Sequence, residues 1–149
     1  MKIILASDHA GFELKNKIKD FLVAEGFGVE DLGASVLDPE DDYPKYMVPA
    51  AMRVVNDPEN TKAIIFGKSG QGEAMVSNRF PGVRAAVYYS HNLEIIRLSR
   101  EHNDANVLSI GAGLITEEQA IEAVKTWIAT PFSGDPRHIR RNEMIDNIQ

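Results

Sequence analysis

The chain has no cysteine among its 149 residues. Disulfide bonds, thiolate metal sites and a cysteine acting as nucleophile or base are therefore excluded. Only four histidines are present, and their spacing does not match metal-ligand patterns. We therefore expect no metal ion in this protein.

Long apolar runs are also missing, and none approaches the roughly 20 residues that cross a bilayer. The first acidic residue, Asp8, comes too early for the apolar region of a signal peptide. The net charge of −6 argues against a general nucleic-acid or membrane-surface binder. We expect a cytoplasmic protein whose residues 1–149 form one domain, because this length can bury a sufficient core.

Short apolar runs alternate with helical patterns along the whole chain. We predict strands at 2–7, 27–33, 61–67, 83–89 and 105–112, and helices at 12–26, 43–57, 72–80, 92–103, 116–130 and about 136–148. Pro49 is unfavourable inside its helix and indicates either a kink or a later start. The alternation predicts an α/β fold with a doubly wound parallel sheet of about five strands.

Ligands bind beyond the carboxyl ends of the strands in such sheets. Three polar or glycine-rich segments follow predicted strands: SDHAG (7–11), GKSGQGE (67–73) and SIGAG (109–113). We expect them to share one edge of the sheet.

The second segment is a glycine loop that leads into a helix. Its glycines allow a sharp turn and expose backbone amides, a combination that binds oxyanions. The spacing G-x-x-G-x-G is neither a dinucleotide fingerprint nor a phosphate loop, so a tight strand-to-helix turn is an equally good explanation. Glu73 follows the last glycine, where it either stabilises the helix dipole or removes a carbon-bound proton beside the amides.

Two histidines lie in further polar segments. Asp8 and His9 end the first strand and either cap a turn or contact the hydroxyl groups of a substrate. His102 and Asn103 precede the last predicted strand. His102 either interacts with a helix dipole or acts as a general acid, because a histidine pKa lies near neutrality.

The segment PRHIRR (136–141) concentrates basic residues in an acidic chain. Arg137 and Arg141 are four residues apart and share one helix face. They form either a solvated basic surface or a phosphate clamp, and the repulsion between such close arginines favours the clamp.

Together these segments resemble the ribose-5-phosphate isomerase B family of sugar-phosphate isomerases. The resemblance is carried by SDHAGFELK, DYPKY, GKSGQGEAMVSNRFPGVRAA, LSREHNDANVLSIGA and RHIRR, in family order. It implies a Rossmann-like three-layer α/β/α sandwich and an aldose–ketose isomerase that needs no cofactor and no metal. It also implies a homodimer, or a tetramer built from dimers, with active sites between two subunits.

The resemblance also implies the roles of individual residues. Some members have a cysteine base where this chain has Phe66, so the chain resembles the branch that uses a glutamate, here Glu73. This base would move a proton between C2 and C1 through a cis-enediol. Ser69 and the loop residues Gly70, Gln71 and Gly72 would hold the carbonyl end of the substrate.

The remaining implied roles concern the ring and the phosphate of the sugar. His102 would open the furanose ring with assistance from Asp8, and Asn103 would contact the sugar. His9, Arg137 and Arg141 would bind the phosphate.

Two departures from the family pattern affect the substrate. Gly113 stands where an arginine usually helps to bind phosphate, and Lys68 stands where glycine is common. Restoring an arginine at 113 should lower the Michaelis constant, unless Lys68 already contacts the substrate. Ribose 5-phosphate is the first expectation. The alternatives are another sugar, such as galactose 6-phosphate or allose, and a non-catalytic sugar-phosphate-binding module.

Overall fold

A computed structural model describes residues 1–148 and contains one sheet of five parallel strands in the order β2-β1-β3-β5-β4. The strands are β1 (Lys2–Ser7), β2 (Gly28–Asp31), β3 (Thr61–Gly67), β4 (Ala85–Tyr88) and β5 (Val107–Gly111). The expected five-stranded parallel sheet is confirmed. The strands β1 and β3 match their predicted limits, whereas β2, β4 and β5 are shorter than predicted.

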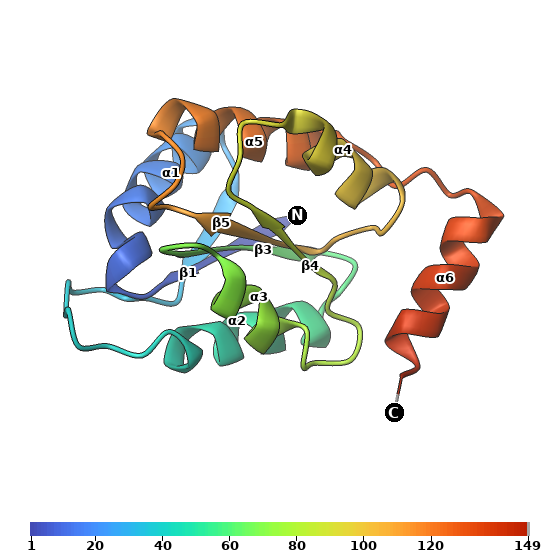
Figure 1. Ribbon diagram of the computed structural model, residues 1–149, viewed down its shortest axis with the longest axis horizontal. Helices are drawn as coiled ribbons and strands as arrows, with labels where there is room; N and C mark the ends of the chain where they lie inside the picture. The colour runs from blue at the N-terminus through green and yellow to red at the C-terminus, as the bar shows by residue number, and fades with distance from the viewer. Residues whose placement is uncertain (149) are drawn as a thin grey trace.

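Helices cover both faces of this sheet (Figure 1). They are α1 (Phe12–Ala24), α2 (Pro44–Asn56), α3 (Gln71–Ser77), α4 (Leu93–Glu101), α5 (Glu117–Ala129) and α6 (Pro136–Asp146), with a short 3-10 turn η1 (His9–Gly11) before α1. Helices α1, α4 and α5 lie on one face, and α2 and α3 lie on the other. The predicted three-layer α/β/α sandwich is therefore confirmed.

The alternation of side chains along β1 explains why both faces are covered. Ile3 and Leu5 pack under α1 and α5, whereas Ile4 and Ala6 pack under α2. A strand buried on both faces needs apolar residues at every position, as in a parallel sheet. Each fully buried leucine or isoleucine contributes about 1.5–3 kcal/mol relative to an exposed one.

Pro49 lies inside α2, which starts at Pro44, so a later helix start is wrong. Proline removes one hydrogen bond from a helix interior. Met47, Ala50 and Val54 are buried against the sheet on the same helix, and this apolar contact offsets the missing bond.

The strand order reverses between β1 and β3, because the chain first moves outward to β2 and then returns to the other side. Strands β1, β3 and β5 are neighbours, so the segments that follow them meet at one edge. The expectation that the three polar segments share an edge is confirmed. A crevice at such a reversal is where open α/β sheets bind ligands.

Helix α6 projects from the opposite end of the molecule, beyond the amino ends of the strands (Figure 1). Its attachment includes an ion pair of 2.7 Å between Arg84 Nη1 and Asp146 Oδ2. Asn142 Nδ2 also donates a hydrogen bond of 3.2 Å to the His102 carbonyl. None of the helices between residues 1 and 148 has the length and apolar character that a membrane crossing requires.

Candidate active site

The glycine loop is held in place by the neighbouring strand β5. Gly70 has φ of 77°, a left-handed conformation that glycine adopts without a steric penalty. The buried Ser109 hydroxyl on β5 donates a hydrogen bond of 2.6 Å to the Gly70 carbonyl. Ser69 Oγ accepts a hydrogen bond of 3.3 Å from the Gln71 amide at the start of α3. The loop thus presents its backbone at the sheet edge in a fixed shape.

Glu73 lies in the first turn of α3 and is 5% exposed. Its carboxyl group packs directly over Gly67, where a Cβ atom would overlap it. Burial raises the pKa of Glu73, and the nearby Asp8 carboxylate adds to this effect. A buried carboxylate with a raised pKa, next to backbone donors, has the properties of a general base.

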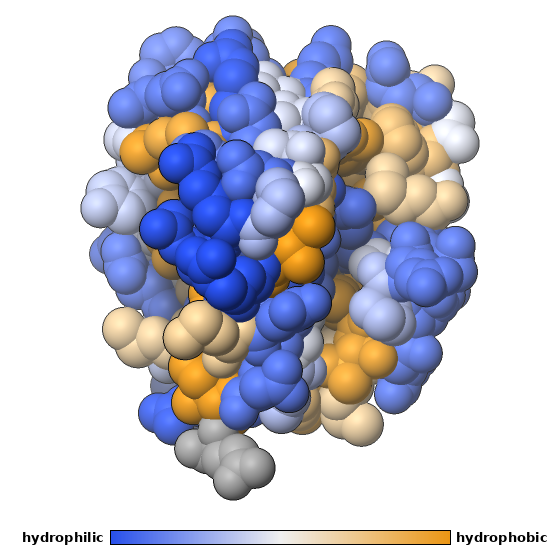
Figure 2. All heavy atoms as spheres, turned by 90° about the vertical axis from the view of Figure 1, so that its right-hand side faces the viewer, coloured by the Kyte–Doolittle hydropathy of each residue, from blue (hydrophilic) through white to orange (hydrophobic). Residues whose placement is uncertain are grey.

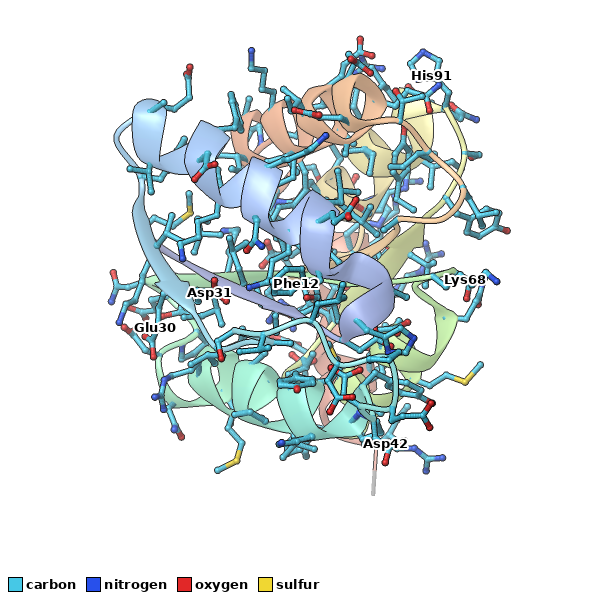
Figure 3. The ribbon with its side chains drawn as sticks, turned by 90° about the vertical axis from the view of Figure 1, so that its left-hand side faces the viewer. Phe12, Glu30, Asp31, Asp42, Lys68 and His91 are labelled. Carbon is cyan, nitrogen blue, oxygen red and sulfur yellow. The ribbon has the colours of Figure 1, made fainter. Side chains whose placement is uncertain are left out.

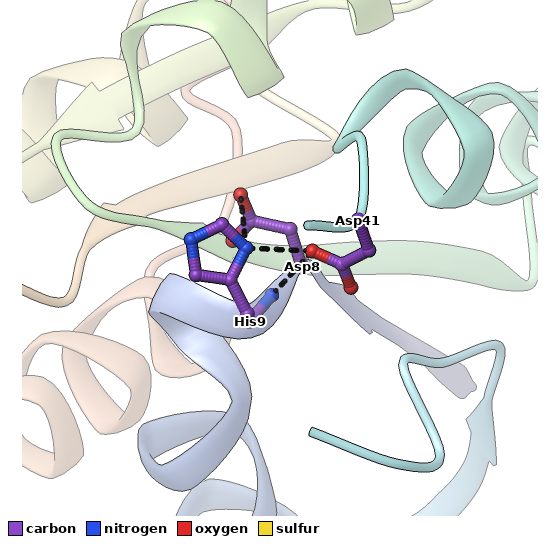
Figure 4. Close-up of side chains that lie close together, drawn as sticks. All are labelled: Asp8, His9 and Asp41. Atoms are coloured by element: carbon purple, nitrogen blue, oxygen red, sulfur yellow. Dashed lines mark hydrogen bonds and ion pairs between the residues drawn. The ribbon is translucent and has the colours of Figure 1, made fainter. Parts of the chain in front are cut away.

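Asp8 and His9 lie at the end of β1, where Asp8 forms the N-cap of η1 (Figure 4). Asp8 Oδ1 accepts hydrogen bonds from the Ala10 and Gly11 amides at 3.0 and 3.4 Å. His9 Nδ1 lies 2.6 Å from Asp41 Oδ1, an atom of the loop between β2 and α2. This hydrogen bond raises the pKa of His9, with smaller contributions from the charges of Asp8, Asp41 and Asp38.

The three groups Asp8, His9 and Asp41 also offer metal-ligand atoms that lie within 4.8 Å of one another. His9 Nδ1 and Asp41 Oδ1 already bond to each other, however, and a cation would have to replace that bond. The hydrogen bond alone accounts for the arrangement, so we assign no metal to this cluster.

Lys68 is exposed on the same edge and extends toward solvent (Figure 3). Its side chain lies beside Gly113: a Cβ atom at Gly113 would be 3.0 Å from Lys68 Cγ and 3.0 Å from the Lys68 carbonyl oxygen. The two residues that depart from the expected pattern are therefore neighbours in space.

A second group of predicted residues lies at the other end of the sheet. His102 is the C-cap of α4, and its ring stacks on His138 of α6 with ring centres 4.2 Å apart. Burial, together with the charges of His102, Arg137 and Arg141, lowers the pKa of His138. Arg137 and Arg141 are exposed on α6 close to this stack.

Figure 2 looks onto this end, where strongly hydrophilic side chains lie beside apolar ones. The exposed apolar side chains of α6 include Ile139, Met144 and Ile145. Asn103 and Ile145 also line a groove of 580 Å³ between α6 and the start of β4. The arginines of α6 thus lie on a projecting helix that also carries solvent-exposed apolar side chains.

One chain therefore brings the predicted residues together in two separate groups. The first, at the carboxyl edge, contains Asp8, His9, Lys68, Ser69, Gly70, Gln71, Gly72 and Glu73. The second contains His102, Asn103, Arg137 and Arg141. The length of β5 separates the two groups, because His102 precedes the amino end of that strand and Gly111 at its carboxyl end pairs with Gly67.

The model of the family described as Ribose/Galactose Isomerase matches residues 3–145. The chain belongs to this family. It is 41% identical over 145 residues to ribose-5-phosphate isomerase B of Mycolicibacterium paratuberculosis. The aligned region covers 97% of this chain and 89% of the relative. It is also 32% identical to a putative sugar phosphate isomerase of Bacillus subtilis, over 98% of this chain and 96% of the relative.

Solved structures of the family have the same fold. A ribose 5-phosphate isomerase from Thermotoga maritima superimposes with a TM-score of 0.91 at 38% identity, covering 99% of this chain and 98% of the other. Ribose-5-phosphate isomerase B from Mycoplasma genitalium, crystallised with bound ribulose-5-phosphate, gives a TM-score of 0.92 at 34% identity, covering 97% and 93%.

Within this family fold, the structure adds three residues that the sequence did not single out. Asp41 bonds to His9, and His138 stacks on His102. The Tyr43 ring packs on the glycine loop, since a Cβ atom at Gly72 would lie 2.6 Å from Tyr43 Cζ. His138 and Tyr43 were visible within the quoted segments RHIRR and DYPKY, whereas Asp41 is one of several acids that precede DYPKY.

Proposed function

We propose that this protein interconverts ribose 5-phosphate and ribulose 5-phosphate through an enediol, with Glu73 as the base. The observation that carries the proposal is the Glu73 carboxyl group, which is buried over Gly67 beside the glycine loop and has a raised pKa. The relatives named ribose-5-phosphate isomerase B, and the bound ribulose-5-phosphate in one of their structures, support the choice of substrate.

The proposed proton transfer needs no external oxidant or reductant. Glu73 takes the proton from C2 of the open-chain aldose, and the electrons form the C1–C2 double bond while O1 becomes negative. Ser69 and the loop amides from Gly70 to Gly72 stabilise that oxygen. O1 is then protonated, O2 loses its proton and becomes the carbonyl oxygen, and Glu73 returns the proton to C1.

We further propose that a second copy of the chain completes the site. Its His102 protonates the ring oxygen of the furanose while Asp8 of the first copy accepts the proton of the O1 hydroxyl. Its Arg137 and Arg141 bind the phosphate together with His9, and its Asn103 contacts the sugar. The separation of the two groups within one chain and the exposed apolar residues of α6 support this arrangement. A homodimer is the smallest closed assembly that allows it.

A second candidate is the same chemistry on another sugar phosphate. Gly113 offers no cation and Lys68 lies beside it, so the charge around the site differs from the pattern expected for ribose 5-phosphate. A panel of phosphorylated and unphosphorylated pentoses and hexoses separates the candidates. The highest kcat/KM on ribose 5-phosphate supports the first proposal, and a hexose preference supports the second.

Replacement of Glu73 by glutamine tests the base directly. We expect Glu73→Gln to lose about two to four orders of magnitude in kcat, because the amide cannot accept the proton. The melting temperature and the affinity for ribose 5-phosphate should stay close to wild type. The measurement is the exchange of the C2 hydrogen in deuterated water.

Glu13→Gln is the matched control, because Glu13 is an exposed acid in the first turn of α1. It should exchange hydrogen at the wild-type rate. Normal exchange by Glu73→Gln would eliminate Glu73 as the base. If the wild-type protein exchanged hydrogen on no sugar phosphate, a non-catalytic binding module would be the remaining explanation.

A further inference from the structure

Asp41 makes two hydrogen bonds to His9 across 32 positions of sequence (Figure 4). One oxygen, Oδ1, accepts from the His9 backbone amide at 3.0 Å and lies 2.6 Å from His9 Nδ1. The Asp41 side chain is 4% exposed, whereas the His9 side chain is 37% exposed. The buried Asp41 carboxylate therefore fixes both the backbone and the ring of His9, while the His9 ring stays accessible to a ligand.

This contact fixes which ring nitrogen faces the site. A carboxylate only accepts hydrogen bonds, so the hydrogen of a neutral His9 ring is on Nδ1. The other nitrogen, Nε2, lies on the side of the ring away from Asp41 (Figure 4). A carboxylate also favours the doubly protonated ring, in which Nε2 is a donor as well.

The charges around His9 act in the same direction. Asp8, Asp38 and Asp41 all raise the pKa of His9, and only burial lowers it. Asp8 Oδ2 is 3.9 Å from Nδ1, too far for a hydrogen bond, and acts on His9 through its charge. The Tyr46 hydroxyl lies beside Asp41, and burial first and then the contact with Asp41 raise the pKa of Tyr46.

We propose that Asp41 is a positioning residue that orients the His9 imidazole and keeps Nε2 able to donate a hydrogen bond to the phosphate group of the substrate. This inference rests on the proposed function, in which His9 binds phosphate. Asp41 itself does not touch the substrate. Its contribution is a charge-assisted contact made through His9, so its loss should affect binding more than turnover.

The alternative is that Asp41 only fastens the β2–α2 loop to η1. Asp41→Asn separates the two explanations, because the amide oxygen of asparagine still accepts a hydrogen bond from the His9 amide while the negative charge is lost. We expect KM for ribose 5-phosphate to rise about tenfold, with kcat changed less than about threefold. The His9 pKa, followed by NMR, should fall, and the rise in KM should be largest at a pH between the lowered value and the wild-type value.

Asp38→Asn is the matched control. Asp38 is an exposed acid of the same loop that acts on His9 only through its charge, so this variant should keep a KM close to wild type. Asp41→Glu, which restores the carboxylate, should recover most of the affinity lost in Asp41→Asn.

A double-mutant cycle with His9→Asn gives the decisive result. If Asp41 acts through His9, Asp41→Asn adds little to the KM of His9→Asn. A full additional rise in KM in that background, or an unchanged KM in Asp41→Asn alone, overturns the proposal. These outcomes differ from failure of the proposed function, in which the wild-type protein isomerises no sugar phosphate while the NMR titration of His9 can still be measured.

Discussion

Asp8 directly follows β1 and Glu73 lies in the first turn of α3, and the charge of Asp8 affects the protonation of Glu73. The Glu73 pKa is raised by burial first and by Asp8 second. Since a general base must be deprotonated, activity is lost as the pH falls through this raised pKa. The acidic limb of the kcat/KM profile should therefore lie above the ordinary glutamate range.

Asp8→Asn should move that acidic limb to lower pH. The asparagine oxygen can still cap η1, so the main change is the loss of a negative charge near Glu73. The overall rate should also fall, because Asp8 assists ring opening in the proposed mechanism. Asp42→Asn, an exposed acid at the end of the β2–α2 loop, is the control and should leave the limb unchanged. An unmoved limb in Asp8→Asn would mean that Glu73 does not set the acidic limb.

Gly67 provides the space that the Glu73 carboxyl group occupies. Gly67→Ala should push this carboxyl group aside, since the end of a flexible side chain moves more easily than the strand. A displacement of about 1 Å can cost a hundredfold in rate, so we expect kcat to fall by about that factor. Stability should change by less than about 1 kcal/mol, because alanine fits a buried strand and restricts the unfolded chain. Urea unfolding and kcat together measure this, and a wild-type kcat would show that the carboxyl position is unimportant.

At the scale of elements, a helix or strand could be predicted from the sequence where its local residue pattern matches its place in the folded chain. The apolar runs of β1 and β3 lie at the centre of the sheet and match their predicted limits. Strand β4 lies at the edge and is shorter than predicted, since fewer neighbours define its ends. Helix α2 continues through Pro49 because burial of its apolar face outweighs the local cost, which a propensity argument cannot weigh.

The candidate site was predictable to a similar extent. Glu73 and Asp8 stand next to turn residues at strand ends, so sequence alone indicated their edge of the sheet. Asp41 was not predictable, because Asp38, Glu40 and Asp42 are equivalent to it in pattern and only the path of the β2–α2 loop brings one of them onto His9. Pairs formed between distant segments depend on such loop paths.

The glycine loop contacts the turn after β5. The effect of an arginine at position 113 on KM should therefore depend on the side chain at position 68. A Cβ atom at Gly113 would be 3.0 Å from Lys68 Cγ and 3.0 Å from the Lys68 carbonyl oxygen, and Lys68→Gly removes only the first of these contacts. We therefore expect Gly113→Arg to lower KM for ribose 5-phosphate about tenfold in a Lys68→Gly background, and by less than about threefold when Lys68 is present. The comparison of KM between these two backgrounds checks this. An equal gain in both would show that the Lys68 side chain does not obstruct position 113.

At the scale of the whole molecule, the two groups of site residues lie at opposite ends of the sheet. Glu73 and the glycine loop occupy the carboxyl edge, whereas the stacked histidines and arginines occupy the end where α6 projects (Figure 1). A single copy cannot apply both groups to one small sugar. In the proposed dimer, α6 of one copy would lie against the carboxyl edge of the other copy, and this contact would also cover the exposed apolar residues of α6.

Complementation between two inactive variants tests this account most directly. Glu73→Gln and His102→Asn are each prepared alone and then mixed at equal concentration under conditions that exchange subunits. In a mixed dimer, the His102→Asn chain supplies Glu73 and the Glu73→Gln chain supplies His102, so one of two sites is intact. With random pairing, half of the dimers are mixed, and the isomerase activity should recover to about a quarter of wild type. Activity that stays at the sum of the two separate variants would contradict a site built from Glu73 of one copy and His102 of another.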